Sequence, residues 1–417
     1  MLFKSLGGPL AGLALAALAA LAGCSTPCDA PGRLCAPPQA NTSAPPPHPR
    51  AGPPVPPPEP VAEVLPIDMP PPGAAPASQP TIRIGLLLPL TSETLGAPAE
   101  AVRAGFMAAY ERERDGFTVN LIDSGESPQQ ALDSYAAAAA QNDILVGPLS
   151  RPAVAAVASS PVVAKPTIAL NYPEMRAGGA AVALPQNMLV MGLSIEDEAR
   201  QVAAWASAEQ RPGATALIVS GASAWQRRLA SAFAAEWQRR GHSAQLAELA
   251  ASNGYLSEAS LGQLKQRIDA EPPALLFTAL DADQLRQLRA TVGTALPCYG
   301  TSSVNPGTEP GMAMAELDGL RLLDLPWEVH PDHPAVMVYP RWTAARHTLD
   351  LDRLYALGID AFRVAREIAL HPGGSFAMDG VTGRLQVSFG QGQAARFERI
   401  QPAAVYQGGA FKLVGGP

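Results

Sequence analysis

The sequence IRIGLLLPLTSETLGAPAEAVRAGFMAAY, residues 82–110, contains the stretch that decides the fold. Residues 82–88 form a run of strand length that is apolar apart from Arg83, and Pro89 ends it. Residues 97–110 then place apolar side chains, Val102 and Phe106 among them, at helical spacing. The stretch therefore predicts a strand, a loop and a helix.

The same alternation continues toward the carboxyl terminus. It predicts further strands at residues 117–122, 144–146 and 166–170, and helices at residues 128–140 and 151–158. Parallel strands need a crossover of about a helix's length, so this order of elements is typical of an α/β fold. We expect a parallel sheet with helices on both faces.

The pattern then restarts with a helix at residues 195–209. Ser194 is its expected cap, and three acidic residues follow in its first turn, where they suit the positive end of the helix dipole. Strands are predicted at residues 216–220, 244–249, 274–278 and 296–299, and helices at residues 225–240, 261–270 and 283–292. This is a second doubly wound unit. After it we expect a helix at 351–370 and hairpin-like strands at 383–389, 395–400 and 411–414.

Two consecutive Rossmann-like halves with a returning tail fit the type I periplasmic binding protein fold, in which the chain crosses between two lobes three times. We expect crossings near residues 190, 300 and 330–350. The two-lobed domain covers residues 81–417. Its first lobe takes about 81–190 plus the C-terminal segments, and its second takes about 191–300 plus part of 301–350.

The first 23 residues have the order of a cleavable export signal. Lys4 precedes an apolar run, residues 6–21, and the run ends in Leu21-Ala22-Gly23-Cys24. The alternative, an uncleaved membrane helix, needs a run of roughly 18 to 20 apolar residues, which is longer than this one. The ending resembles the lipobox of bacterial lipoproteins, which implies lipidation of Cys24 and a lipid anchor in a membrane. Ser25, in place of aspartate, resembles proteins sorted to the outer membrane.

Residues 24–80 hold the expected lipidated cysteine and a tether. Residues 25–80 contain nearly half of the chain's 43 prolines and almost no large apolar side chain. Such a segment buries too little surface to offset the entropy of ordering, so we expect disorder. In an extended polyproline form it would reach on the order of 150 Å.

The net charge limits the classes of partner, and the positions of the cysteines indicate their expected chemical state. The net charge of -7 and the pI near 5.5 argue against a nucleic-acid partner, which would need a clustered basic face. Cys28 and Cys35 lie in the tether and are candidates for a disulfide in an exported protein, with their redox state left open. Cys298 is expected to be a buried apolar cysteine.

Several short stretches together resemble the penicillin-binding protein activator family, the LppC- or LpoA-like lipoproteins. They are Ile84–Leu90, Val146–Leu149, Ala169–Asn171, Gly192–Ser194 with Glu196–Ala199, Leu325–Trp327 and Leu354–Phe362. The resemblance implies an outer-membrane lipoprotein that faces the periplasm and stimulates a bifunctional peptidoglycan synthase. The best-known members carry a helical-repeat domain before the two-lobed domain, whereas this chain has the proline tract, so the sequence does not identify the synthase.

No enzyme motif is convincing. None of the four lysines has a serine three residues before it, and the Gly-x-Ser-x-Gly elbow is absent. Residues 390–395 superficially match a dinucleotide fingerprint, but strand-like residues follow, which favours a hairpin turn. His330, Asp332 and His333 are a compact set for zinc, although flanking prolines favour a solvated loop. We expect no catalytic residue, no metal and no cofactor.

Ligands in open α/β sheets bind at the carboxyl ends of strands, which in this fold face the cleft between the lobes. The candidate ligand-binding residues on those loops are Thr91, Ser92, Ser150, Asn171 and Asp281. Each has a structural alternative as a helix cap or turn residue. Two functions stay open: a non-enzymatic activator of a penicillin-binding protein, or a membrane-tethered solute receptor for an amino acid or cell-wall fragment.

Overall fold

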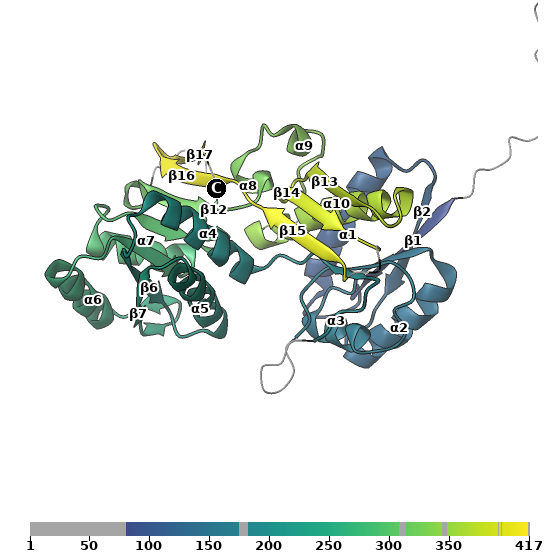
Figure 1. Ribbon diagram of the computed structural model, residues 1–417, viewed down its shortest axis with the longest axis horizontal. Coiled ribbons are helices and arrows are strands. Elements are labelled where there is room, and N and C mark those ends of the chain that lie inside the picture. The colour runs from purple at the N-terminus through teal and green to yellow at the C-terminus, as the bar shows by residue number, and fades with distance from the viewer. Residues whose placement is uncertain are drawn as a thin grey trace, which may run out of the picture. The chain divides into compact units, whose positions relative to one another are not determined.

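A computed structural model describes residues 81–174, 182–307, 314–343, 348–390, 392 and 394–415 (Figure 1). The predicted leader and tether, with Cys24, Cys28 and Cys35, lie outside the described residues. In the part that is described, two sheets built mainly of parallel strands carry most of the helices. No helix there combines the length and the apolar composition that crossing a membrane requires.

The first lobe contains a five-stranded parallel sheet of order β2-β1-β3-β4-β5. Its strands are β1 (Ile82–Leu88), β2 (Phe117–Asp123), β3 (Ile144–Val146), β4 (Thr167–Ala169) and β5 (Met188–Val190). The last five residues of β1 are buried, because helices cover both faces of the sheet. The prediction for residues 82–88 is confirmed to the residue.

Four helices cover this sheet. They are α1 (Gly96–Arg112), α2 (Pro128–Gln141), α3 (Arg151–Ala158) and the long C-terminal α10 (Leu349–Leu370). Side chains of α1 and α10 share one core with Ile84, Leu86 and Leu88 of β1. Side chains of α2 and α3 share another core with Leu87 and Leu145. The sheet therefore lies between two helical layers.

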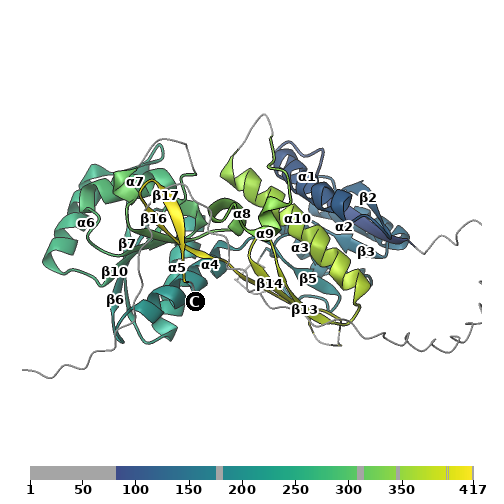
Figure 2. The same cartoon turned by 90° about the horizontal axis from the view of Figure 1, so that it is seen from above.

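Helices α1 and α10 lie side by side (Figure 2) and approach closely through two glycines. A Cβ atom on Gly105 would lie 1.9 Å from the carbonyl oxygen of Tyr355, and one on Gly358 would lie 2.1 Å from that of Val102. Only residues without a side chain allow this backbone contact. Phe106 and Phe362 pack edge to face beside it, with ring centroids 5.3 Å apart.

The second lobe contains a seven-stranded sheet of order β17-β16-β12-β11-β10-β6-β7. Its strands are β6 (Thr215–Ser220), β7 (Ser243–Glu248), β10 (Leu275–Ala279), β11 (Cys298–Gly300), β12 (Leu320–Leu323), β16 (Ala403–Gln407) and β17 (Ala410–Val414). The first five are parallel, whereas β16 and β17 are antiparallel.

Two helices cover each face of this sheet. They are α4 (Ile195–Glu209), α5 (Ala224–Arg239), α6 (Glu258–Ala270) and α7 (Ala282–Val292). Helices α4 and α5 pack on one face around Phe233 and Phe277, and α6 and α7 pack on the other around Leu264 and Leu276. Ser194 caps α4 as predicted, since its side chain accepts a hydrogen bond from the backbone of Asp197.

Smaller elements complete the structure. They are the β8 (Ala251–Ser252) and β9 (Tyr255–Leu256) hairpin, two 3-10 turns (Ser302–Val304, Ala315–Leu317), the short helices α8 (Pro326–Val329) and α9 (Pro334–Met337), and an antiparallel sheet of β13 (Ser375–Asp379), β14 (Arg384–Ser388) and β15 (Arg396–Ile400). The inner face of this sheet, with Leu385 and Val387, packs into the first lobe's core.

Two of the three expected crossings lie elsewhere. The first follows β5 near residue 190, as predicted. The second follows β12 near residue 324 instead of residue 300, because β12 still belongs to the seven-stranded sheet. The third follows β15 near residue 401, instead of 330–350. Strands β16 and β17, which we expected in the first lobe with the other C-terminal segments, extend the second sheet instead.

Candidate functional site

The carboxyl ends of the second lobe's strands meet the start of α10 at a cavity of about 710 Å³, which we call the cleft. Its described lining combines apolar, acidic and small polar side chains with one arginine. The lining residues are Leu193, Ile195, Glu198, Trp225, Asp281, Ala282, Asp283, Ser302, Ser303, Asn305, Leu325, Thr348, Leu349, Asp350, Arg353 and Leu354. The position agrees with the expected cleft between the lobes.

Four helices, α4, α5, α7 and α10, begin at the cleft. A helix amino terminus attracts anions because its first backbone N–H groups are unpaired. Here the chain supplies its own acceptors. The side chain of Asp281 accepts from the backbone N–H of Gln284 at 2.8 Å, and Thr348 accepts from that of Leu351 at 3.3 Å. At α7 a carboxylate of the protein already occupies the place that an anionic ligand would take.

Arg353, the single basic side chain in the described lining of the cleft, is turned toward a buried acid. Its Nη2 donates to Oδ2 of Asp324 at 2.7 Å and its Nε to Oδ1 at 3.1 Å. Asp324 has no exposed surface, and Arg353 is 8% exposed. Burial disfavours the charge of the guanidinium, but Asp324 outweighs it and raises the pKa of Arg353. Arg353 and Asp324 therefore form a buried ion pair.

Glu198, in the first turn of α4, connects distant segments. Its Oε2 accepts from the backbone N–H of Ser302 at 3.1 Å and from the hydroxyl at 2.7 Å, and its Oε1 accepts from Nε2 of Gln401 at 3.1 Å. Burial, reinforced by Asp324, raises the pKa of the Glu198 carboxyl. The first crossing is thus joined to the loop after β11 and to the third crossing.

Arg399 makes the corresponding connection on the first-lobe side. Its guanidinium donates to the carbonyl oxygens of Gly192 and Met191, both at 2.9 Å, and to Oγ1 of Thr382 at 3.0 Å. Asp360, which is fully buried, accepts from the hydroxyl of Thr382 at 2.7 Å. Burial lowers the pKa of Arg399. We call these joined residues the crossing network: Glu198, Ser302, Asp324, Arg353, Asp360, Thr382, Arg399 and Gln401.

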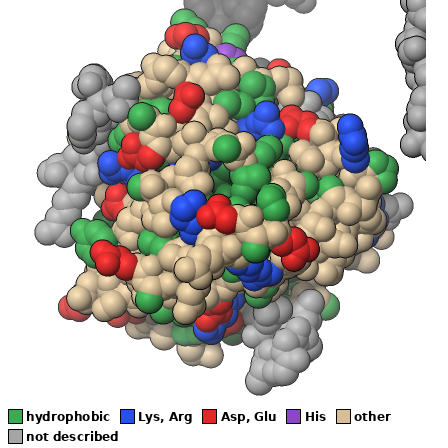
Figure 3. Space-filling model, turned by 90° about the vertical axis from the view of Figure 1, so that its left-hand side faces the viewer, with side chains coloured by type: hydrophobic (Ala, Val, Ile, Leu, Met, Phe, Trp, Pro, Cys, Tyr) green, Lys and Arg blue, Asp and Glu red, His purple; other side chains and the backbone are tan. Residues whose placement is uncertain are grey.

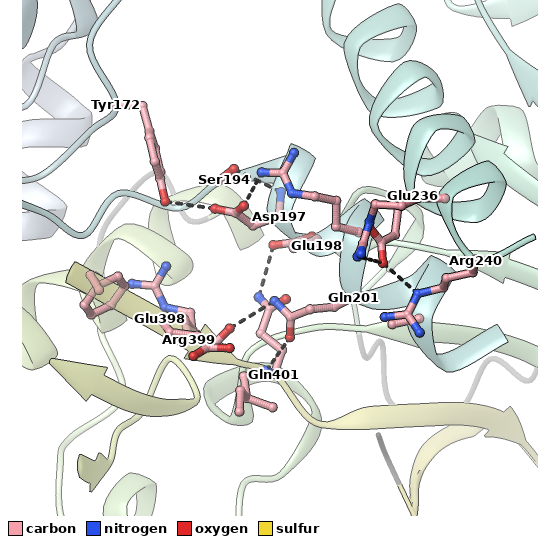
Figure 4. Close-up of a pocket in the computed structure, with 15 residues that line it drawn as sticks. Tyr172, Ser194, Asp197, Glu198, Gln201, Glu236, Arg240, Glu398, Arg399 and Gln401 are labelled. Carbon is pink, nitrogen blue, oxygen red and sulfur yellow. Dashed lines mark hydrogen bonds and ion pairs between the residues drawn. The ribbon is translucent and has the colours of Figure 1, made fainter. Parts of the chain in front are cut away.

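A second cavity, of about 520 Å³, lies beside the same segments, and Glu198 lines both cavities (Figure 4). Tyr172 reaches into it and donates its hydroxyl to Asp197 at 2.8 Å. Gln201 donates to the carbonyl oxygen of Arg399 at 3.0 Å and accepts from the backbone N–H of Gln401 at 3.1 Å. These polar groups bind one another and join α4 to the third crossing.

Another buried carboxyl, that of Glu328 in α8, belongs to the surroundings of Arg353. Burial and the nearby Asp324 raise the pKa of Glu328 to about 8, and its Oε1 has no hydrogen-bond partner. The group is therefore largely neutral at pH 7.

One protein family matches most of the chain. The family described as "LppC putative lipoprotein" matches residues 57–399. The chain belongs to the LppC family. No curated protein matches it in sequence.

Solved structures agree with the fold of this LppC-family chain. A structure described as a "putative branched-chain amino acid ABC transporter", from Chromobacterium violaceum ATCC 12472, is 34% identical and covers 78% of this chain and 100% of its own, with a TM-score of 0.64. The C-domain of LpoA (YraM) from Haemophilus influenzae, "a regulator of PBP1A", is 21% identical over 80% and 100% of the two chains, with a TM-score of 0.61.

Full-length LpoA from Haemophilus influenzae is 22% identical, with a TM-score of 0.61, and the match covers 81% of this chain. The LppC-family chain spans only 59% of the length of that protein. The matches confirm the predicted α/β fold with two Rossmann-like lobes of the type I periplasmic binding protein kind.

The structure places one of the five predicted cleft residues, Asp281, in the lining of the cleft, where it caps α7. The other four do not line it. Thr91 donates to Asp123, and Ser92 accepts from the backbone N–H of Leu95. Ser150 caps α3, and Asn171 donates to the carbonyl oxygen of Leu149. All five thus make local hydrogen bonds that hold loops and helix ends.

Other predicted features have local explanations in this LppC-family chain. Nδ1 of His333 accepts from the backbone N–H of Ala335 and caps α9. Among the described residues no group of three or more His, Cys, Asp or Glu is arranged to hold a metal. Strands β14 and β15, which precede and follow residues 390–395, pair antiparallel, as the hairpin interpretation required. Cys298 is free and fully buried, and burial raises the pKa of its thiol.

The side chains on one face of the second lobe indicate which class of partner could bind there. Figure 3 shows the end that carries α6, where acidic and basic side chains are interspersed around a hollow in which hydrophobic side chains gather. Nucleic-acid binding needs a block of basic charge. This face offers mixed charge and apolar surface instead.

Sequence patterns alone do not identify Asp324, Arg353, Arg399 or Gln401. A signal for part of the set was present, because the stretches that carry the family resemblance border the crossing network. Glu196–Ala199 contains Glu198, Leu325–Trp327 follows Asp324, and Leu354–Phe362 follows Arg353. What the sequence lacked was any indication that these stretches meet.

Proposed function

We propose that this chain is a non-enzymatic, lipid-anchored regulator that binds and activates a bifunctional peptidoglycan synthase, a penicillin-binding protein. Membership of the LppC lipoprotein family supports the proposal. The fold that the chain shares with the C-domain of LpoA, described as a regulator of PBP1A, agrees with it.

The charge of the cleft is the observation that favours a regulator over a solute receptor. A receptor for amino acids must hold a carboxylate, and it does so with unpaired N–H groups or a free cation. Here Asp281 caps the helix that begins at the cleft, and Arg353 is committed to Asp324. An anionic group entering the cleft would meet carboxylates.

The anchor and tether suit a regulator that works away from its membrane. We propose that Cys24 is lipidated after removal of residues 1–23, and that the protein is held in the outer membrane facing the periplasm. Residues 25–80 then give the two lobes a reach on the order of 150 Å when extended. That length allows contact with a synthase in the opposite membrane.

Activation is proposed to be allosteric. A partner that binds the active conformation of the synthase more tightly than the inactive one shifts the population toward the active form. The crossing network supports this role because it holds the two lobes as one preformed surface, so little binding energy is lost in ordering the regulator.

The test is a reconstitution. The mature chain and each bifunctional penicillin-binding protein of the same bacterium are purified in detergent, and glycan polymerisation and peptide crosslinking are measured with and without the chain. We expect one synthase to bind and at least one of its two rates to rise. No binding and no change of rate with any synthase would refute the proposal.

A thermal shift assay with leucine, isoleucine and valine addresses the solute receptor. A ligand that binds only the native state raises its melting temperature. We expect no shift, and a shift of several degrees would favour the receptor.

A further inference from the structure

The floor of the cleft is apolar. Leu193, Ile195 and Leu325 come from the segments between the lobes, Leu349 and Leu354 come from α10, and Trp225 comes from α5. Trp225 is only half-buried. Tryptophan and leucine in a recess of this kind are typical anchors of protein interfaces.

The rim of the cleft is acidic on both sides. Asp283, on α7 of the second lobe, has a side chain 82% exposed, and Asp350, on α10 of the first lobe, has one 90% exposed. Arg286 lies 3.8 Å from Asp283, but its Nε donates to Glu316 at 2.7 Å. Oδ1 of Asp350 accepts from Nη1 of Arg353 at 3.0 Å. Both rim carboxylates nevertheless remain largely exposed to solvent.

The cleft has a net negative charge. Its described lining contains Glu198, Asp281, Asp283 and Asp350 against one arginine, Arg353. Arg353 is already paired with the buried Asp324 at 2.7 Å and with Asp350 at 3.0 Å, and Asp281 and Asp283 make no ion pair with it. Complementarity across an interface places positive charge against such a rim.

The segments beside the cleft are also joined to one another. Moving the lobes together would shift the crossing segments, and these are joined through buried hydrogen bonds of Glu198, Arg353 and Arg399. Breaking such contacts leaves buried charges unpaired, which is costly. A small solute relies on being enclosed for its affinity, whereas a segment fixed within a larger protein does not.

We propose that the cleft receives a segment of the partner synthase that carries a lysine or arginine next to large apolar side chains. The apolar side chains lie on Trp225, Leu349 and Leu354, and the basic group lies between Asp283 and Asp350. This inference rests on the proposed function, since it names the surface and the chemistry through which the synthase docks.

The test compares two double variants of the mature chain, purified in detergent. Asp283→Lys with Asp350→Lys reverses the rim charge without touching the cap Asp281. Glu258→Lys with Asp133→Lys makes the same change of charge at exposed positions away from the cleft, one on each lobe, and Glu258 is likewise in the first turn of its helix. Melting curves check that both fold.

Affinity for the synthase identified by reconstitution is measured at low and high salt. We expect the rim variant to bind at least tenfold more weakly than the natural chain and to lose most of its salt dependence, while the control stays within about twofold. Equal affinity of the rim variant and the natural chain would overturn the inference and leave the proposed function standing. If the natural chain binds no synthase, the proposed function fails and the inference falls with it.

A second experiment distinguishes binding of a protein segment from binding of a free amine. L-lysine and cadaverine at 10 mM are added in a thermal shift assay. We expect no change in melting temperature. A rise of several degrees that the rim variant abolishes would show that the cleft takes a small cation, and would overturn the docking segment.

Discussion

The contact between α1 and α10 and the crossing network both join parts of the chain that are far apart in sequence, but their chemistry is opposite. The first is an apolar contact in which Gly105 and Gly358 let two backbones touch. The second consists of buried charges and amides that hydrogen-bond to one another across the crossings. The contact between α1 and α10 has no space for an added methyl group. In the crossing network, removing one charged group leaves its partner buried without a counter-ion.

The largest effect is expected from Gly358→Ala. The new methyl group would lie 2.1 Å from the carbonyl oxygen of Val102 and 2.8 Å from the backbone nitrogen of Phe106, so the helices must separate. We expect the free energy of unfolding to fall by about 4 kcal/mol, measured by urea denaturation.

Gly262→Ala in α6 is the matched control, because no atom lies within 4 Å of the added Cβ. There the substitution should stabilise by about 0.5 to 1 kcal/mol, through helix propensity alone. A Gly358→Ala protein as stable as the natural chain would refute the close contact.

The next effect is expected from Arg353→Met. The variant leaves Asp324 buried without its counter-ion, and we expect a loss of about 3 kcal/mol in urea denaturation. The double variant Arg353→Met with Asp324→Asn removes both charges and should recover about 1 to 2 kcal/mol of that loss. If the double variant is less stable than the single one, the ion pair is not what joins these segments.

A smaller effect, dependent on pH, is expected at Glu328. Its pKa of about 8 in the folded chain exceeds that of an ordinary glutamate, so the folded state holds this proton more tightly than the unfolded state. The stability from the neutral carboxyl is complete below the unfolded pKa and is lost as pH rises toward 8.

Glu328→Gln keeps the shape and cannot ionise. We expect the variant to exceed the natural chain in stability by on the order of 2 kcal/mol at pH 8.5 and to match it near pH 4.5, measured by urea denaturation at both values. A difference independent of pH would show that Glu328 does not titrate as described.

The smallest effect is expected from Lys265→Gln, which removes an ion pair on the exposed face of α6. Its Nζ lies 3.2 Å from Asp269, with the two side chains 46% and 61% exposed. Solvent screens such a pair, so we expect a loss below about 0.5 kcal/mol. A loss as large as that of Arg353→Met would mean that burial does not explain the strength of the crossing network.

The sequence predicted the local elements well because their signals are local. The apolar run of β1 and the bounds of α3 and α4 were predicted to the residue. The short strands β3, β4 and β11 were predicted because each follows a predicted helix. Strands β5, β12 and β16 follow loops or another strand, and they were not predicted. The missing β12 and β16 explain why the second and third crossings were placed elsewhere.

The crossing network escaped prediction for a different reason. Glu198 meets Ser302 and Gln401 across more than a hundred residues of sequence, and Arg399 meets Gly192 across two hundred. Such pairs are set by how the two sheets are connected, which no pattern in a short window encodes. Asp281 was found because a strand followed by a cap residue is a local signal.

The path of the chain has a consequence for biosynthesis. The first lobe lacks one of the two helices on one face of its sheet until α10 has been made, and the second lacks two strands until β16 and β17 have been made. Neither lobe is therefore a continuous stretch of the chain. Each core is complete only once these later segments are present, and until then part of each sheet stays uncovered.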